Sequence, residues 1–530
     1  MTKIGPKRSR SLSRADSAER LAQFSRELID LIMSGSIKDR DAFQNIKMKM
    51  CHKYRLDTVP PNSTILAEAT SVEREVVEPY LVKKPVRTIS GVAVVAVMTS
   101  PHPCPHGKCT YCPGGVENDS PQSYTGKEPA ARRASRNEFD PWMQVTDRIR
   151  QLEEIGHRTD KIDLIIMGGT FTCREPDYQE WFVKRCFDAM NGRDAPDIET
   201  AQAWNSVSEH RCVGLTVETR PDAFDDEQIR RAMMLGATRV ELGVQILDDP
   251  ILLAVNRGHG VKEVVECTER CRRNGLKVCY HIMPGLPGSS PEKDLESFRL
   301  MYSDSRFRPD MLKFYTTLVI GGTQLYEMWE RGEYSPYDVD TAVDLLTQMK
   351  SEVPEYVRIQ RIQRDIPAPQ IAAGILKSNI RQLVQDNLEK KGLACRCVRC
   401  REVGHSHVSL DDPDNVRFRT VEYEASGGKE HFISLVYGDA LIGYVRLRVD
   451  GSDTATIREL KVFGKIASIG EQGKDWQHRG FGRELVAEAE RLALASGASR
   501  IRVTSGVGVR EYYASLGFGL ERPYMAKDLK

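Results

Sequence analysis

The chain has 530 residues, too many for one ordinary hydrophobic core, so two or three domains are expected. With 40% hydrophobic residues, 28% charged residues and a formal net charge of +1, its overall charge identifies no partner, and a nucleic-acid signal must come from local clusters. No run approaches the roughly 20 apolar residues of a membrane span. The basic N-terminus also lacks the apolar segment of a secretory signal. These features predict a cytoplasmic protein without a membrane partner.

Residues 1–80 are predicted to form a basic arm followed by a small helical module. The first 20 residues are rich in Lys, Arg and Ser, which is typical of disorder. Leu21, Phe24 and Leu28 then recur at helical spacing, and residues 47–53 add further positive charge. The module is a candidate nucleic-acid contact, and a merely solvated basic surface is the alternative.

From Gly91 onward, short β-branched runs alternate with amphipathic segments, which is typical of repeated βα units. The predicted strands are 92–98, 164–167, 213–218, 239–244, 277–283 and 311–315. Six such units predict an α/β fold, a partial (β/α)6 TIM-like barrel of parallel strands, over residues 81–390. In a barrel of this kind, the loops at the carboxyl ends of the strands build the active site.

The loop after the first predicted strand concentrates cysteines. PHPCPHGKCTYCPGG, residues 101–115, places Cys104, Cys109 and Cys112 within nine residues among prolines and glycines. Three thiolates so close together predict a cluster-binding loop. They can hold three irons of a [4Fe-4S] cluster and leave the fourth iron open to a small-molecule ligand.

Polar residues follow the later strands as well. MGGTF (167–171) comes after the second strand, ETRPD (218–222) after the third and HIMPGLPG (281–288) at the end of the fifth, while ELGVQ (241–245) lies within the fourth. Buried parallel strands are normally apolar, so these residues predict one active site. Lys313 lies in the apolar strand MLKFY, where a lysine is costly to bury unless paired. We expect Lys313 to face this site as a catalytic residue, with a role in substrate or cofactor binding.

A second cysteine group lies in a linker predicted over residues 391–408. KGLACRCVRCREVG contains Cys395, Cys397 and Cys400, and His405 and His407 follow. Three thiolates with a nearby imidazole suit a structural Zn²⁺. A second iron–sulfur cluster is the alternative, which the position between domains and the flanking arginines disfavour. The fourth ligand stays open between His405 and a distant residue such as His281.

Residues 409–530 are predicted to form an α+β domain. Strands at 432–437, 441–449 and 456–462 precede QHRGFGRELVAEAERLALASG, in which a glycine loop begins an amphipathic helix. Glycines let backbone N–H groups approach a phosphate at a helix N-terminus. The candidate pyrophosphate-binding residues are Gln477, His478, Arg479, Gly480, Phe481 and Gly482.

This loop resembles the Q/RxxGxG/A motif of the GNAT acetyltransferase family. A strand at 500–504 and VREYYASLGF (509–518) follow at the spacing of that fold. The resemblance implies that acetyl-CoA binds here, with Tyr512 and Tyr513 as catalytic residues near its thioester end. Core packing is the alternative role for one of the two tyrosines.

The motifs of the barrel also carry a resemblance. CPHGKCTYC, GGTF, ETRPD, ELGVQ, NRGH and HIMPGLPG, in that order, resemble the radical S-adenosylmethionine domain of the Elongator subunit 3 family, in its archaeal or bacterial single-subunit form. QSYTGKEPAARRA (122–134), RPDMLKFYTTLVIGGT (308–323) and RIQRDIP (361–367) look like further signatures of that family. The resemblance runs from about residue 80 to the C-terminus. The first two cysteines are separated by four residues instead of the commoner three, a gap that varies within the family.

The family resemblance implies that S-adenosylmethionine binds the open iron. It places Gly168, Gly169 and Thr170 near the methionine amino group of that cofactor. The residues implied for its ribose and polar groups are Glu218, Glu241 and Gln245. An electron donor for the cluster is implied as a partner, while a homodimer and an Elongator-like assembly both stay open.

Together, the two cofactors predict one reaction. A radical derived from S-adenosylmethionine takes hydrogen from the methyl group of acetyl-CoA, the acetyl radical adds to C5 of a uridine, and thioester hydrolysis leaves a carboxymethyl group. The family resemblance supplies the substrate, the wobble uridine U34 in the anticodon stem-loop of tRNA. Basic residues of the N-terminal region, together with Arg132, Arg133 and Arg136, fit an RNA partner.

Two alternatives use the same domains differently. One is a protein lysine acetyltransferase in which the barrel has only a structural role. The other is a non-catalytic tRNA-binding module that senses acetyl-CoA. The polar residues at successive strand ends argue against a purely structural barrel.

Overall fold

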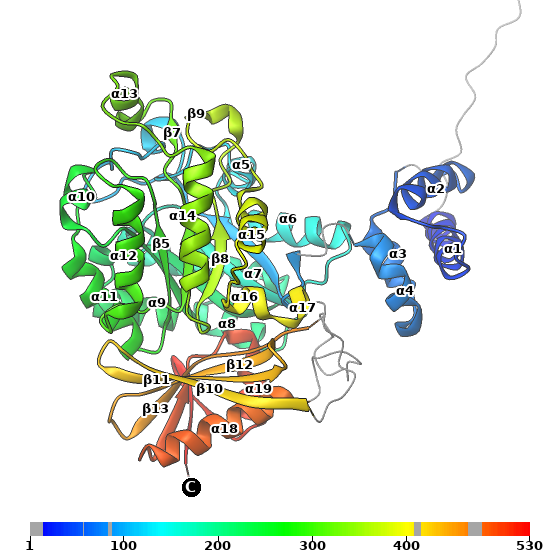
Figure 1. The fold of residues 1–530 in the computed structure, drawn as a ribbon. Helices are drawn as coiled ribbons and strands as arrows, with labels where there is room; N and C mark the ends of the chain where they lie inside the picture. Colours follow the sequence, from blue (N-terminus) through cyan, green and yellow to red (C-terminus); the bar gives the residue numbers. More distant parts are fainter. Residues whose placement is uncertain (1–13, 57, 83–86, 407–414, 465–479, 530) are drawn as a thin grey trace, which may run out of the picture. The chain divides into compact units, whose positions relative to one another are not determined.

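The computed structural model describes residues 14–56, 58–82, 87–406, 415–464 and 480–529 (Figure 1). The chain divides into two compact units, residues 1–88 with 147–159, and residues 89–146 with 160–530. Among the helices described, none combines the length and the apolar composition that a membrane crossing requires.

The predicted N-terminal helices are confirmed, but the first begins at Arg14, inside the stretch predicted to be disordered, and residues 1–13 of that stretch lie outside the described part of the chain. α1 (Arg14–Met33), α2 (Arg40–Lys53), α3 (Asn62–Ala67) and α4 (Ser71–Leu81) share an apolar core that includes Phe24, Leu28 and Phe43. Lys47, from the predicted basic stretch, is 4% exposed and donates a hydrogen bond to Asn62 Oδ1 at 2.6 Å. Lys47 therefore stabilises the helical core, and its charge does not belong to a basic surface.

The larger unit contains the predicted parallel sheet. Its strands are β1 (Ala93–Met98), β2 (Lys161–Met167), β3 (Arg211–Thr219), β4 (Arg239–Gln245), β5 (Lys277–Ile282), β6 (Met311–Phe314) and β8 (Arg358–Ile362). They pair in that order, each parallel to the next. All six predicted strands are present. β8 is an additional seventh strand, which the sequence analysis did not predict because RIQRI is short and mostly polar.

The faces of these strands differ in burial. On β2, Ile162, Leu164 and Ile166 are fully buried, whereas the alternating residues are only half-buried. The buried face packs against an outer layer of helices, among them α7 (Pro176–Asn191), α11 (Val261–Arg273), α12 (Pro291–Ser303) and α14 (Val339–Glu352) (Figure 1). The half-buried face lines the interior of the barrel. Because β1 and β8 are the two edges of the sheet, the barrel is open, as predicted.

A second sheet follows in the C-terminal part of the same unit. Its order is β10 (Val416–Ala425), β11 (Gly428–Tyr437), β12 (Ala440–Val449), β13 (Thr454–Val462), β14 (Arg500–Val503), β16 (Tyr524–Asp528) and β15 (Gly519–Glu521). The predicted meander of β11, β12 and β13 is confirmed, as is the helix α18 (Phe481–Ala495). β13 and β14 run parallel over four residue pairs only, ending at Ile457 with Val503. Beyond that point β13 continues without β14 as a partner.

A buried ionic cluster joins this sheet to the barrel. Arg458, on β13, contacts Asp310 Oδ1 at 2.6 Å and Glu430 Oε2 at 2.8 Å. Arg272, at the end of α11, contacts Glu430 Oε1 at 3.1 Å. All four side chains are at most 1% exposed, and Arg458 also donates to the carbonyl of Leu276, just before β5. The cluster therefore fixes the C-terminal sheet against the amino ends of the barrel strands.

We expect Glu430→Gln to lower the free energy of unfolding by about 3–5 kcal/mol, because it leaves buried arginines without their counter-charge. Urea unfolding followed by circular dichroism measures this loss. Glu424→Gln, at an exposed position on β10, is the matched control and should change stability by no more than about 0.5 kcal/mol. Equal stability of the two variants would contradict a structural role for the cluster.

Candidate functional site

A cavity lies at the carboxyl ends of the barrel strands, and we call it the cysteine cavity. Of the residues predicted for cluster and S-adenosylmethionine binding, the ones that line it are Cys104, Cys112, Gly169, Thr170, Glu218, Glu241 and Gln245. Cys109 is buried and is not one of the lining residues. Residues of β2, β3, β4, β5 and β8 and of the cysteine loop therefore meet at one place, as expected of a barrel active site.

Each cysteine sulfur of the loop has a polar neighbour from another segment. The three pairs are Cys104 with Thr170 Oγ1 at 3.5 Å, Cys112 with the donor Gln122 Nε2 at 3.5 Å, and Cys109 with the donor Arg257 Nη1 at 3.6 Å. Hydrogen bonds of this kind stabilise charge on thiolate ligands and tune the potential of an iron–sulfur cluster. Three thiols with donors directed at their sulfurs fit a cluster with one open iron.

The glycines after β2 allow a close approach to the segments on either side of the cysteine loop. Gly168 has φ +129°, and a Cβ atom there would lie 2.2 Å from Thr99 Oγ1. Gly169 has φ +93°, and its Cβ atom would lie 3.0 Å from Gln122 Cβ. Only glycine fits this contact without strain. The pair brings Thr170 beside Cys104 and exposes backbone at the cavity wall.

Glu241 is the most heavily paired carboxylate of the cavity. Lys313 donates to Glu241 Oε2, and His281 Nε2 lies 2.8 Å from the same oxygen. Burial alone would raise the pKa of Glu241, but Lys313 first, and then His281 and Arg239, hold it well below its usual range. Burial likewise lowers the pKa of Lys313, and Glu241 outweighs that effect and raises it. Lys313 is thus paired, as its strand context requires; it is not one of the residues that line the cavity, and it reaches the cavity through its contact with Glu241.

Several residues of this cavity were not assigned a role from the sequence. Tyr124 donates a hydrogen bond to Glu218 Oε2 at 2.8 Å, and Gln122 and Arg257 contact cysteine sulfurs as described above. All three lie in the segments QSYTGKEPAARRA and NRGH. These motifs marked the segments as important, but the sequence did not show which side chains Gln122, Tyr124 and Arg257 contact, because those contacts join separate parts of the chain.

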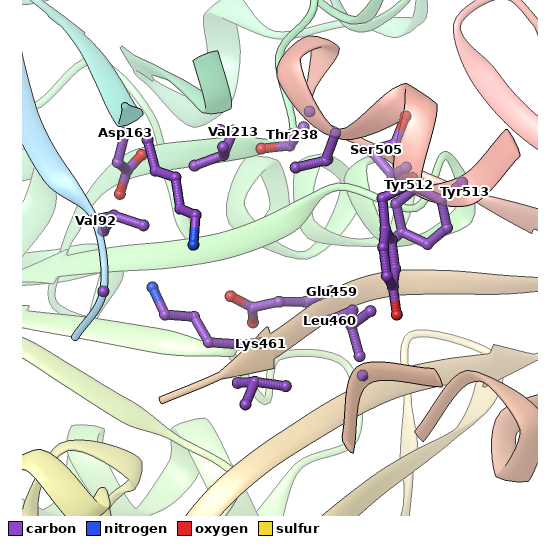
Figure 2. Close-up of a pocket in the computed structure, with 18 of the residues that line it drawn as sticks. Val92, Asp163, Val213, Thr238, Glu459, Leu460, Lys461, Ser505, Tyr512 and Tyr513 are labelled. Carbon is purple, nitrogen blue, oxygen red and sulfur yellow. The ribbon is translucent and has the colours of Figure 1, made fainter. Parts of the chain in front are cut away.

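A larger cavity, of about 640 Å³, lies at the amino ends of the barrel strands, and we call it the tyrosine cavity. Figure 2 shows Asp163, Val213 and Thr238 on one side, Glu459, Leu460 and Lys461 on the other, and Tyr512 and Tyr513 at one end. The predicted residues Gly480, Phe481 and Gly482 also line it. Gln477, His478 and Arg479, the remaining predicted residues of this loop, lie outside the described part of the chain.

The wall of the tyrosine cavity has the features of a phosphate site beside a helix. Gly480, with φ +91°, is the N-cap residue of the 15-residue helix α18, whose N-terminus favours negative charge. A Cβ atom on Gly482 would lie 2.7 Å from the Tyr512 hydroxyl. Tyr512 is 37% exposed, whereas Tyr513 is 4% exposed and packs edge-on against Phe518. Burial raises the pKa of Tyr512 to about 12, so its hydroxyl stays protonated at neutral pH.

The second cysteine group is also assembled. The sulfurs of Cys395, Cys397 and Cys400 all lie within 4.8 Å of one another, so they could hold a metal ion. His281, one candidate for the fourth ligand, instead contacts Glu241 in the barrel. His405 Nε2 lies 3.2 Å from Glu402 Oε1. His407 lies outside the described residues.

Four family models match successive parts of the chain. They are the ELP3 N-terminal domain over residues 21–89, the Radical SAM superfamily over 100–301, the Radical_SAM C-terminal domain over 309–390 and the Acetyltransferase (GNAT) family over 400–518. The radical S-adenosylmethionine and acetyltransferase domains predicted from the motifs are thereby confirmed.

The chain is also similar to curated proteins along most of its length. A protein from Methanocaldococcus infernus named tRNA uridine(34) acetyltransferase is 50% identical over 93% of this chain and 96% of its own. The protein of that name from Dehalococcoides mccartyi is 49% identical over 84% of this chain and 100% of its own. Human Elongator complex protein 3 is 40% identical over 93% and 94%, respectively.

A solved structure supports the same relationship. The archaeal Methanocaldococcus infernus Elp3 with a deletion of its N-terminus (1-46) is 46% identical, with a TM-score of 0.74. The match covers 83% of this chain and 100% of that chain.

We expect Lys313→Met to lower the free energy of unfolding at pH 7 by about 3–5 kcal/mol, because Glu241 is left buried without its main cation. In the unsubstituted protein, the pKa of Glu241 is lower in the folded state than in the unfolded state, where a Glu has a pKa of about 4.3. This difference stabilises the fold at pH values above about 4.3, and the stabilisation is lost as the pH falls through the pKa of Glu241 in the folded state. In the variant, the effect of Lys313 is missing, so burial raises the pKa of Glu241 in the folded state. The difference in stability between the two proteins should therefore shrink from pH 7 to pH 4.

Urea unfolding at the two pH values measures this change. Lys377→Met, at an exposed position, is the control and should leave stability nearly unchanged at both. A difference that stays constant with pH would show that Lys313 does not hold Glu241 in its charged form.

Proposed function

The chain belongs to the Elongator complex protein 3 family, and we propose that it converts uridine 34 of tRNA to 5-carboxymethyluridine. The relatives named tRNA uridine(34) acetyltransferase support the tRNA substrate. One observation carries the chemistry: a single compact unit contains both the cysteine cavity and the tyrosine cavity, at opposite ends of the same barrel strands. An enzyme that only transfers acetyl groups does not need the cysteine cavity, and a radical enzyme that does not use acetyl-CoA does not need the tyrosine cavity.

The cysteine cavity fits a [4Fe-4S] cluster with S-adenosylmethionine. Cys104, Cys109 and Cys112 would hold the cluster. With one electron from a donor, the bound pair supplies a 5′-deoxyadenosyl radical. Gln122 and Arg257 stabilise the charge on the sulfurs.

The cavity wall offers contacts for the rest of S-adenosylmethionine. The backbone of residues 168–170 can receive its methionine amino group. Glu218, Glu241 and Gln245 offer oxygens to its ribose hydroxyls and other polar groups. Lys313 supports this role, since it keeps Glu241 ionised and therefore a hydrogen-bond acceptor.

The tyrosine cavity fits acetyl-CoA. The N-terminus of α18, with Gly480 and Gly482, can bind the pyrophosphate. After Ile457, β13 is no longer paired with β14, so the backbone of this part of β13 can bind the pantetheine arm of acetyl-CoA. The protonated hydroxyl of Tyr512 can donate toward the thioester sulfur, and the carboxylate of Glu459, which lines the cavity, can accept a hydrogen bond from a water and orient it.

The proposed bond changes balance as follows. One methyl hydrogen of acetyl-CoA moves to C5′ of the 5′-deoxyadenosyl group, and the resulting carbon radical bonds to C5 of the uracil. Loss of the C5 proton and of one electron to a redox partner restores the ring. Water then cleaves the thioester, which releases CoA and leaves a carboxymethyl group.

Basic side chains beside the cysteine cavity support an RNA partner. α5 (Pro129–Arg136) begins with residues that line the cavity, and its Arg132 and Arg136 are exposed. Arg133, predicted to belong to the same patch, is 7% exposed and donates to the carbonyl of Ala96 at 2.7 Å. Two of the three predicted arginines are therefore available for phosphate contacts.

We expect reconstituted protein to form carboxymethyluridine when it is incubated anaerobically with tRNA, S-adenosylmethionine, a reductant and acetyl-CoA. Cys109→Ala should abolish both this product and 5′-deoxyadenosine while tRNA binding persists, because cluster ligation and RNA contacts use different side chains. Cys173→Ala, at a half-buried cysteine outside the loop, is the control. Nucleoside mass spectrometry detects the product. Absence of carboxymethyluridine despite an intact cluster would contradict the proposal. Acetyl label on protein lysines would favour a lysine acetyltransferase.

We also propose that the second cysteine group binds Zn²⁺. Three closely spaced sulfurs match the ligand preference of a structural zinc site. Purified protein should contain about one zinc ion per chain, and Cys397→Ser should remove it, while Cys186→Ser, at a buried cysteine elsewhere, should not. Elemental analysis measures the zinc and iron content of each variant. If Cys397→Ser lowers the iron content instead of the zinc content, the result would support a second iron–sulfur cluster.

A further inference from the structure

The segment that leads into β5 packs against the place where β13 and β14 separate. The pairing of these two strands ends at Ile457 with Val503, and residues that follow on each strand line the tyrosine cavity. A Cβ atom on Gly275, two residues before β5, would lie 2.5 Å from Thr504 Oγ1 and 2.8 Å from Thr456 Cγ2. The barrel therefore touches both strands at the point where they part.

Lys277, the first residue of β5, lies at this point. The carbonyl of Leu276 accepts a hydrogen bond from Arg458 Nη1 at 3.0 Å, which holds the start of β5 against β13. Lys277 lines the tyrosine cavity and is 9% exposed. Within the described part of the chain, its Nζ atom makes no hydrogen bond and no ion pair within 4.0 Å. A buried lysine is normally paired, so an unpaired one in a cavity wall is a candidate for a chemical role.

Glu459 is the carboxylate that acts most strongly on Lys277. The pairing of β12 with β13 places Arg446 opposite Glu459 and leaves Arg458 without a partner on β12, which is a β-bulge. A bulge re-aims the side chains of its strand, so the consecutive residues Arg458 and Glu459 can both contact the barrel side. Figure 2 shows the carboxylate of Glu459 inside the cavity. The amine of Lys277 and a carboxylate therefore face the same space from opposite walls.

Burial weakens the hold of Lys277 on its proton. Burial lowers the pKa of Lys277 to about 8, although the carboxylate of Glu459 opposes this change. Among the other charged groups around it, Arg239 and Lys461 lower the pKa further and Asp163 raises it. At pH 7 about a tenth of the Lys277 side chains are neutral amines, compared with less than about 0.1% for a lysine of ordinary pKa, about 10.4. Only the neutral amine has the lone pair that a nucleophile requires.

We propose that Lys277 is a self-acetylation site, whose Nζ atom accepts the acetyl group of an acetyl-CoA molecule bound in the tyrosine cavity. The inference rests on the proposed function, which assigns acetyl-CoA to this cavity. The nitrogen bonds to the carbonyl carbon, the C–S bond breaks, and one proton passes from the nitrogen to the sulfur, so that CoA leaves as a thiol. No oxidant or reductant is needed. The product is an uncharged amide, so Glu459 loses the cation on the opposite wall.

Two other lysines, Lys161 and Lys461, line the same cavity. Lys161 has an interaction partner of its own. Lys461 lies further along β13, with its Nζ atom 5.9 Å from the centre of the Phe463 ring. Of the three, Lys277 follows directly on the segment that packs against the separating strands. It is therefore the amine best placed to meet a thioester held between those strands.

Mass spectrometry of the full reconstituted chain tests this site without tRNA or S-adenosylmethionine. The protein is incubated with acetyl-CoA that carries 13C in its acetyl group, and acetylated peptides are mapped. We expect label on Lys277 to reach a plateau as the acetyl-CoA concentration rises, and free CoA should suppress it by competing for the cavity. Lys262, whose side chain is 80% exposed, reports direct chemical acetylation. Its label should rise in proportion to acetyl-CoA and should not respond to CoA.

The pH dependence gives a second readout on the unsubstituted protein, so the test does not depend on the folding of a variant. The initial rate of labelling at Lys277 should rise about tenfold from pH 6 to pH 7 and level off above about pH 8, because it follows the neutral amine. Labelling at Lys262 should keep rising to about pH 10. No label on Lys277, or label that follows the behaviour of Lys262 in both measurements, would overturn the inference.

A pair of variants locates the acceptor. Lys277→Arg keeps the positive charge and removes the amine, so it should abolish the saturable label while the Kd for acetyl-CoA stays within about twofold of the unsubstituted value. Lys262→Arg is the matched control and should leave the label on Lys277 unchanged. Saturable label that persists in full in Lys277→Arg would show that another residue is the acceptor and would contradict the proposal.

The outcomes separate self-acetylation from the proposed function. If Lys277 stays unlabelled while the same protein makes carboxymethyluridine, self-acetylation is wrong and the proposed function stands. If Lys277 is labelled while no carboxymethyluridine forms, the proposed function fails and the modification site stands.

Discussion

The buried cluster around Asp310 and Glu430 holds the two halves of the larger unit in one arrangement. Two carboxylates and several arginines are removed from water together, and such groups are tolerated only when nearly every charge has a well-placed partner. Asp310 precedes β6 and Arg458 lies on β13, so the cluster sets the position of β13 against the barrel. The tyrosine cavity lies between β13 and the barrel, so its shape depends on the position of β13.

The interior of the barrel is also charged. An interior filled with branched apolar side chains would separate its two ends, whereas this one carries Asp163, Arg239, Glu241 and Lys313 in successive contact. Charged side chains can be buried there because each has an opposite charge within 4 Å. One sheet can thus present a cavity at each end, and the distance between the two cavities is set by the length of its strands.

Burial also divides the basic residues that looked alike in the sequence. Lys47 and Arg133 lie inside the protein with hydrogen-bond partners, whereas Arg132 and Arg136 remain at the surface. A run of positive charge along the chain does not say which members share a face, because that depends on where each helix docks. Only the exposed members can contribute to a salt-dependent contact with RNA.

The sequence by itself determined the features that depend on local pattern. The six predicted strands, the cysteine loop and the helix after the glycine loop were correctly located, because β-branched runs, close cysteine spacing and helical periodicity are properties of neighbouring residues. The tertiary structure alone decided the rest. β8 pairs with β6 and β16 pairs with β14, strands that are distant in the sequence, whereas β10 and β15 are edge strands that form hairpins with β11 and β16. The contacts of Gln122 and Arg257 with the cysteines arise between segments that only folding brings together.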